Sequence, residues 1–239
     1  MMIASCSKNP YTEKNDLTLF MNKSQEQKIG DRQHNLLTNN FGGIYKSPLL
    51  GAYIASIGAK IANSANLNTE SFTFTILNSP IVNAFASPGG YIYVTRGLIA
   101  MCNNEAELAF VIAHEIAHIQ ERHSLHQIVE IVGLSSLAWL IFGLDEGILE
   151  EVALVGINLW SMKKSRDFEK DSDLLALEFL ENAGLKKESF ILAIEKLTEH
   201  FCPKSKLDKS DCLTGVKSGW LATHPTGAER LKYLREKID

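Results

Sequence analysis

Three residues, His114, Glu115 and His118, form the pattern HExxH inside an apolar stretch of the chain. In a helix, side chains four positions apart lie on one face, so the two imidazoles can reach a single zinc ion. Glu115 then lies beside them, where its carboxylate can handle a proton. The pattern is typical of metal-dependent peptidases, although a pentapeptide of this form also occurs by chance in amphipathic helices.

A catalytic zinc needs a third protein ligand and an open position for water. One known arrangement requires glycine at position 121 and histidine at position 124, but Glu121 and Ser124 stand there. The other arrangement has a glutamate on a separate helix and an aspartate four residues later, and Glu169 and Asp173 fit it. We therefore predict that Glu169 is the third ligand of one Zn²⁺ ion per chain.

Asp173 is predicted to lie on the same helical face as Glu169. A metal-bound imidazole must be held in one tautomer, and a carboxylate near the site can accept the hydrogen bond that does so. Asp173 is the candidate for this role, and the alternative is an ordinary surface carboxylate.

Four blocks of sequence resemble one family of zinc metallopeptidases. They are residues 83–93, residues 106–123, residues 165–173 and Thr223-His224-Pro225 with Arg230 and Leu231. In this order they resemble the HtpX and CAAX-prenyl-protease family, most closely its soluble periplasmic lipoprotein members of the LoiP and BepA type. A departure is Ser172, where the family usually has alanine. The resemblance covers most of residues 13–237 and implies a zincin-like (gluzincin) domain.

The resemblance also implies catalytic roles. Glu115 is expected to accept a proton from a zinc-activated water as that water attacks a peptide carbonyl, and then to protonate the leaving amine. In relatives, the histidine that corresponds to His224 lies on a loop near the metal. There it either fills the open coordination position in a resting state or stabilises the oxyanion. Alternatively, His224 only bonds within a turn at the start of the helix after Pro225.

Residues that could bind substrate or support the metal site each have an ordinary structural interpretation as an alternative. Asn83, Ala84, Phe85 and Ala86 belong to a segment that could act as an exposed edge strand and pair with an extended substrate, or that could be an ordinary sheet edge. Arg122 could pair with a carboxylate that supports the site, or lie at a solvated helix end.

The composition fits one domain without a nucleic-acid partner. The chain has 239 residues, a net charge of −4 and 45% hydrophobic residues, which is enough for a sizeable core over residues 13–239. There is no basic run that could carry a phosphate-binding surface. Cys202 and Cys212 flank a polar loop and could form a disulfide in an oxidising compartment, or remain two unpaired thiols.

The first residues resemble the end of a bacterial lipoprotein signal, because small residues precede Cys6. Only five residues stand before this cysteine, too few for an export signal, so the match indicates a truncated signal or is accidental. We interpret residues 1–12 as a signal remnant and linker with Cys6 as the lipidation site. This predicts a periplasmic protein associated with the outer membrane through a lipid anchor.

The pattern of residues predicts an α+β fold that is mostly helical, with a small sheet beside the HExxH helix. Helices are expected over 24–37, with Ser24 and Gln27 as the cap, over 48–65, and from Asn104 through the HExxH motif. Further helices are expected around Asp173 with an end at Gly184, over 188–200 and after 225. Strands are expected over 72–77, 83–87 and 91–95, with a turn at 88–90. Residues 128–162 are interpreted as two buried or amphipathic helices, with a membrane hairpin as the alternative.

Two functions follow from these patterns. The first is a zinc endopeptidase that cuts unfolded or misfolded proteins of the cell envelope. The second is a chaperone-like protein that binds clients beside a mostly closed metal cleft. The presence of Glu115 favours the first, because a binding protein has no need of a general base there.

Overall fold

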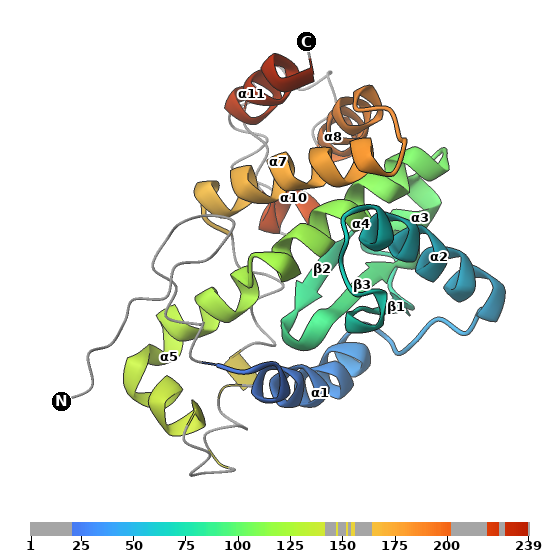
Figure 1. Ribbon diagram of the computed structural model, residues 1–239. Coiled ribbons are helices and arrows are strands. Elements are labelled where there is room, and N and C mark those ends of the chain that lie inside the picture. Colours follow the sequence, from blue (N-terminus) through green and yellow to red (C-terminus); the bar gives the residue numbers. More distant parts are fainter. Residues whose placement is uncertain are drawn as a thin grey trace.

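The computed structural model describes residues 21–141, 147, 152, 154–155, 164–201, 219–224 and 228–238 (Figure 1). The predicted lipidation site Cys6 and the predicted disulfide between Cys202 and Cys212 lie outside these residues and stay predictions. Most of the second helix expected within 128–162 also lies outside them. Among the described helices, none combines the length and the apolar character that crossing a bilayer requires.

The described part of the chain consists of helices before and after one group of three short strands. In chain order they are α1 (Lys23–Asn40), α2 (Pro48–Ser64), η2 (Thr69–Ser71), β1 (Thr73–Leu77), β2 (Ala84–Ser87), η3 (Pro88–Gly90), β3 (Tyr91–Thr95), α3 (Arg96–Met101), α4 (Glu105–Gln120), α5 (His123–Ile141), α7 (Arg166–Asn182), α8 (Glu188–Phe201), α10 (Trp220–Thr223) and α11 (Ala228–Ile238). The mostly helical α+β architecture predicted from the sequence is confirmed.

The strands form a mixed sheet in the order β1-β3-β2. β1 runs parallel to β3, and β2 runs antiparallel to β3 with Phe85 opposite Tyr93. The predicted turn between β2 and β3 is the 3-10 turn η3. Gly90 has φ +83 there, and a Cβ at this position would stand 1.8 Å from the carbonyl oxygen of Ser71, so only glycine fits. Because β2 pairs on one side only within the described sheet, it is an edge strand.

Helix α4 lies between this sheet and α7 (Figure 1), and it also packs against α2 and α8. Asn104 caps its N-terminus as predicted, because Asn104 Oδ1 accepts a hydrogen bond from the N–H of Glu107 at 3.0 Å. In return, Glu107 Oε2 accepts a hydrogen bond from the N–H of Asn103 at 2.9 Å. Every residue from Glu107 to His118 is buried. The motif helix is therefore the centre of the main hydrophobic core.

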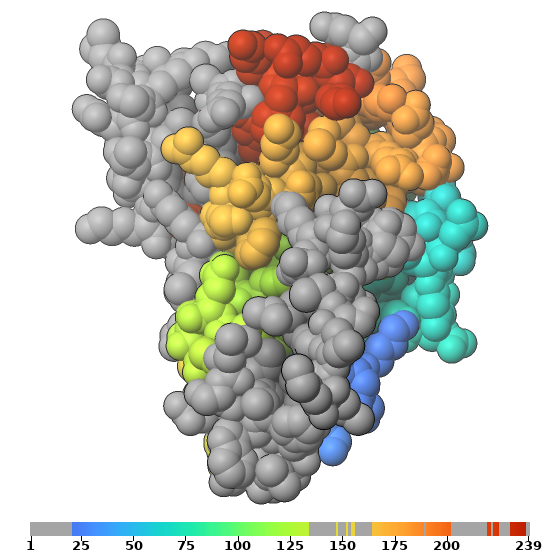
Figure 2. Space-filling model, turned by 60° about the vertical axis from the view of Figure 1, so that its left-hand side comes forward, coloured from blue at the N-terminus to red at the C-terminus, as the bar shows by residue number. Residues whose placement is uncertain are grey.

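Helix α7, which carries Glu169 and Asp173, packs against α4. Ser165 is its N-cap and accepts from the N–H of Phe168 at 3.1 Å. At the other end, Gly184 adopts φ +71 as predicted, and the N–H of Leu185 donates to the carbonyl of Leu180. Figure 2 shows the molecule from another side. On this face the surface of α11 (red) lies at the top, that of α7 (amber) below it, and that of the first part of α5 (yellow-green) below α7.

The predicted cap of the first helix was wrong by two residues. The capping box is formed by Asn22 and Gln25, which exchange hydrogen bonds of 3.0 and 2.9 Å between side chain and backbone. Ser24 and Gln27 have the same spacing, but the side chain of Gln27 instead donates to Asp31 within the helix. Both pairs have the three-residue spacing of a capping box, and asparagine is as good an N-cap as serine, so the sequence alone does not choose between them.

Candidate metal site

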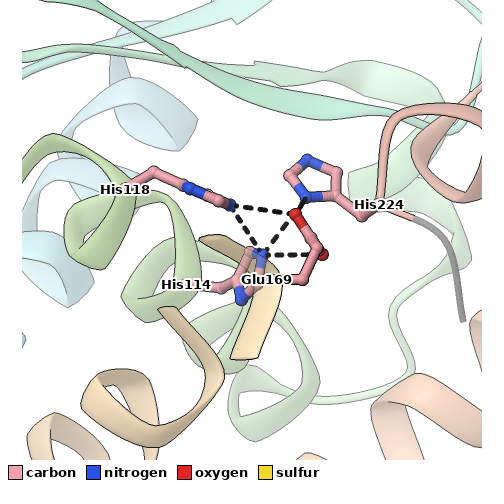
Figure 3. Close-up of side chains that lie close together, drawn as sticks. All are labelled: His114, His118, Glu169 and His224. Carbon is pink, nitrogen blue, oxygen red and sulfur yellow. Dashed lines mark hydrogen bonds and ion pairs between the residues drawn. The ribbon is translucent and has the colours of Figure 1, made fainter. Parts of the chain in front are cut away.

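Four buried side chains converge between α4, α7 and the residue after α10 (Figure 3). His114 and His118 come from α4, Glu169 from α7, and His224 follows α10. The Nε2 atoms of the two α4 histidines are 3.0 Å apart. Glu169 Oε2 lies 3.6 Å from Nε2 of His114, and its Oε1 lies 3.4 Å from Nε2 of His118. The three side chains predicted as ligands therefore face one point.

His224 joins this group from the opposite side. Its Nδ1 lies 3.2 Å from Nε2 of His114 and 2.9 Å from Oε1 of Glu169. The backbone holds the residue in place, since its N–H donates to the carbonyl of Trp220, and the indole of Trp220 stacks on the imidazole with 4.7 Å between ring centroids. Of the two alternatives from the sequence, the structure places His224 at the cluster.

The donor atoms fit a tetrahedral zinc ion. With zinc-to-nitrogen bonds of about 2.0–2.1 Å, the edges of a regular tetrahedron measure about 3.3 Å. Five of the separations between donor atoms run from 2.9 to 3.6 Å, and one donor atom from each residue lies within 4.8 Å of all the others. Burial also lowers the pKa of His118 and of His224 well below the ordinary value, so both rings are neutral, as metal ligands must be. The four donors are therefore suited to hold one cation between them.

Asp173 orients His114 toward that point. Its Oδ1 lies 3.0 Å from Nδ1 of His114, so the N–H of that ring faces the carboxylate and the lone pair on Nε2 faces the cluster. Both side chains are fully buried, which excludes the surface alternative for Asp173. Burial alone would raise the pKa of Asp173, but the guanidinium of Arg230 and the nearby His114 hold it at about 2.

Arg230 of α11 links two carboxylates of the site. Its Nε and one terminal nitrogen donate to Asp173 at 2.5 and 2.6 Å, and its other terminal nitrogen lies 3.1 Å from Glu169 Oε2. Tyr233 also donates to Asp173. Arg230 is not among the site residues predicted from the sequence, although it stands in the fourth block of the family resemblance. Its position in that block was the signal that could have marked it.

A second small network holds His118. Its Nδ1 lies 3.0 Å from the hydroxyl of Ser172 and 2.8 Å from Nδ1 of His123, whose ring stacks on Phe168 with 4.2 Å between centroids. Ser172 is the position at which the chain departs from the family pattern. Its hydroxyl therefore contacts a predicted metal ligand, and neither this contact nor that of His123 was predicted from the sequence.

Ser172→Ala is expected to lower the affinity for zinc about tenfold. Losing a group that orients a ligand costs about 10- to 100-fold in metal affinity, and the lower end applies because His123 still contacts His118. Competition for zinc against a coloured chelator would measure the change. Ser64→Ala is the matched control, since that hydroxyl only donates to the carbonyl of Lys60 at the end of α2. Equal affinity in both variants would contradict the role of Ser172.

Glu115 is fully buried and points to the other side of His224. Its Oε1 lies 3.4 Å from Nε2 of His224, and its Oε2 lies 3.8 Å from Nζ of Lys164. Burial lowers the pKa of Lys164, while Glu115 and Glu169 oppose this shift. Lys164 was not predicted as a site residue, because nothing in the sequence around it marks it.

Beside Lys164 and His224 the surface is hollowed over the edge strand. The hollow contains about 230 Å³ not filled by atoms, including the solvent at its mouth. Its lining residues come from β2, from the start of α5 and from the segments before α7 and around His224: Phe85, Ala86, Ser124, Gln127, Lys164, Thr223 and His224. The hollow thus lies next to the general base candidate and the edge strand.

The remaining predicted residues lie in two places. Asn83, Ala84, Phe85 and Ala86 run along the edge strand near the cluster, and their side chains are buried. Arg122 lies elsewhere, since it donates to Glu26 of α1 at 2.9 Å and to the carbonyl of Met21. The structure therefore gives Arg122 a contact with a carboxylate outside the metal cluster.

Comparison with known proteins agrees with this site. The family model described as peptidase family M48 matches residues 48–238. The chain is 28% identical over 90% of its length to the beta-barrel assembly-enhancing protease of Yersinia pestis, covering 44% of that protein. It is 26% identical to the metalloprotease YcaL of Escherichia coli, covering 81% of this chain and 72% of the relative. It is also 26% identical to the mitochondrial metalloendopeptidase OMA1 of Schizosaccharomyces pombe, covering 77% of this chain and 52% of the relative. The chain spans less than half the length of the assembly-enhancing protease.

Proposed function

Because the chain belongs to peptidase family M48, we propose that it is a zinc-dependent endopeptidase that hydrolyses peptide bonds in unfolded or misfolded proteins of the cell envelope. The observation that carries the proposal is the meeting of His114, His118 and Glu169 at one buried point with Glu115 next to it. Two neutral imidazoles and a carboxylate are the ligand set of a catalytic zinc site.

A zinc ion at this point would polarise the peptide carbonyl and make water more acidic. Glu115 is the group that takes the proton from that water and later gives it to the leaving amine, because its carboxylate is buried beside the cluster. Asp173 and Ser172 keep the two histidines in the tautomer that directs their lone pairs to the metal.

Edge strand β2 is proposed to pair with the substrate backbone. The N–H of Thr95 donates to the carbonyl of Asn83 at 3.0 Å, so in an antiparallel pair the backbone groups of Ala84 and Ala86 point away from β3. The hydroxyl of Ser124 in α5 donates to the carbonyl of Ala86 at 2.9 Å. An extended substrate would exchange this bond for one of its own. Backbone pairing gives little side-chain selectivity, which suits unfolded proteins.

The envelope location rests on the lipoprotein-like start of the chain, on the family resemblance and on relatives named for beta-barrel assembly. With it we propose a periplasmic protein, anchored by a lipid on Cys6, whose disulfide joins Cys202 and Cys212. Residues 13–239 would then be one peptidase domain.

One observation favours the second function, a chaperone-like protein that binds clients without cutting them. His224 fills the fourth corner of the cluster, and all four donor side chains are buried, so the arrangement is closed. The two functions differ in whether this closed arrangement opens for a substrate.

His224→Ala is expected to leave one zinc per chain and to raise the rate of cleavage of an unfolded protein on the order of tenfold. The three remaining ligands still hold the metal, and the variant no longer has to open a closed arrangement; a tenfold change corresponds to about 1.4 kcal/mol. Elemental analysis and a digestion assay would measure both effects. His200→Ala, an exposed histidine of α8, is the control. Loss of zinc would contradict the ligand set, and a slower reaction with zinc retained would indicate oxyanion stabilisation instead.

The function itself is tested by digestion of casein, an unfolded substrate, with the purified chain and its Glu115→Gln variant. Metal-dependent cleavage by the unaltered chain alone supports the endopeptidase. Equal cleavage by both would exclude the chemistry proposed for Glu115, and binding without cleavage by either would favour the chaperone-like function.

A further inference from the structure

Lys164 is a buried cation that the proposed chemistry does not use. Its side chain is 4% exposed, and its ammonium has no hydrogen-bond acceptor among the described residues. The nearest carboxylate oxygen, Glu115 Oε2, lies 3.8 Å away, which is beyond hydrogen-bond distance. An ammonium group has three N–H donors, and leaving them unsatisfied in a buried place is costly. Beyond the described residues, the ammonium can therefore still take a further acceptor.

The place from which an acceptor can arrive is the hollow over β2. Lys164 lines it together with the hydroxyls of Ser124 and Thr223, and Phe85 and Ala86 of the edge strand form another part of its lining. Among the lining residues, Lys164 is the one lysine or arginine, and none is acidic. The backbone N–H of Lys164 donates to the carbonyl of Thr223 at 3.1 Å, which fixes this segment beside His224. The hollow is thus a donor-rich recess beside the strand proposed to pair with the substrate.

The charges around the site also favour an anion. Three carboxylates, of Glu115, Glu169 and Asp173, face two cations, Lys164 and Arg230, and all five are buried. Their formal sum is −1, and a bound dication would turn it to +1. Asp173 and Glu169 already receive the guanidinium of Arg230. Lys164 instead faces Glu115 at 3.8 Å and has no hydrogen-bond acceptor among the described residues, so a further anion would find its donors there.

We infer that Lys164 makes this hollow a carboxylate-binding subsite, which gives the peptidase a preference for a substrate with a carboxylate close to the bond that is cut. The inference rests on the proposed function and adds to it a class of substrate. The carboxylate can belong to an Asp or Glu side chain within the substrate or to the free C-terminus of the substrate chain. Both present the same two acceptor oxygens to the ammonium.

The experiment compares fluorogenic peptides that differ at one position near the cleaved bond, with Glu in one and Gln in the other. For the unaltered, zinc-loaded chain we expect kcat/KM about tenfold or more higher with Glu, since a hydrogen bond to a charged group is gained. Lys164→Met is expected to bring the ratio to about one, and Lys164→Arg to keep it. Because the ratio is taken within each variant, a general loss of activity does not affect it. The control is Lys187→Met, a partly buried lysine paired with Glu181 at 2.7 Å and outside the lining of the hollow.

A binding measurement separates this inference from the proposed function. In the Glu115→Gln chain, fluorescence anisotropy should give tighter binding of the Glu peptide than of the Gln peptide, and Lys164→Met in that background should remove the difference. If the unaltered chain cuts no peptide, the endopeptidase is contradicted, and the binding ratio alone decides about the subsite. Equal binding and equal cleavage of both peptides, or a ratio that Lys164→Met leaves unchanged, overturns the inference. Peptides with a free and an amidated C-terminus show which source of carboxylate the subsite takes.

Discussion

Glu115→Gln is expected to lower the rate of casein cleavage by about 100- to 10,000-fold, which is the usual contribution of a positioned general base. Glutamine keeps the size of the side chain but cannot accept the proton of the attacking water. Glu115 is not one of the four converging donors of the metal cluster. The variant should therefore keep one zinc per chain, and a chelator should lower the activity of the unaltered chain at least as far, because it removes the metal as well.

The control for this variant lies on the same helix. Glu105→Gln changes an exposed carboxylate in the first turn of α4 that accepts from Tyr53, and it should cleave at the rate of the unaltered chain. Zinc content by elemental analysis and fragment release by gel would be measured for all three proteins. Cleavage by Glu115→Gln at an undiminished rate would rule out this residue as the base.

Arg230→Met is expected to destabilise the chain by about 3–5 kcal/mol, because it leaves two buried carboxylates without their cation. For a chain of this length the melting temperature should fall by about 10 °C. Zinc affinity should fall as well, since Arg230 holds both the ligand Glu169 and the residue that orients His114. Calorimetry and zinc competition would measure the two effects.

Arg235→Met provides the comparison on the same helix, α11. Arg235 is 60% exposed and pairs with Glu195, also at the surface, and exposed pairs contribute at most about 1 kcal/mol. If Arg230→Met melted at the temperature of Arg235→Met and kept its zinc, the buried network would not support the site as described.

The sequence predicted those parts of the site that depend on local spacing. The positions of His114 and His118 follow from the period of a helix, and the pairing of Glu169 with Asp173 follows from the same period on α7. The cap at Asn104 and the left-handed Gly184 are likewise fixed by residues within one helical turn. Local patterns of this kind are read directly from the chain, and the structure confirms them.

The parts that the sequence did not predict are contacts between distant segments. Arg230 meets Asp173 across 57 positions, and Ser172 meets His118 across 54. Nothing in the neighbourhood of Lys164 shows that it will lie beside Glu115, because the packing of α4 against the segment before α7 decides this. The first helix cap failed for a different reason, since two polar pairs with equal spacing compete for it.

The metal cluster joins positions that lie far apart along the chain, because Glu169 follows His114 by 55 residues and α11 fixes Asp173 only from residue 230 onward. During synthesis the ribosome releases the HExxH helix long before these later segments exist. Until they emerge and dock, the nascent polypeptide cannot grip the ion in its final geometry. The proposed hydrolysis would therefore begin only once translation of this region is complete.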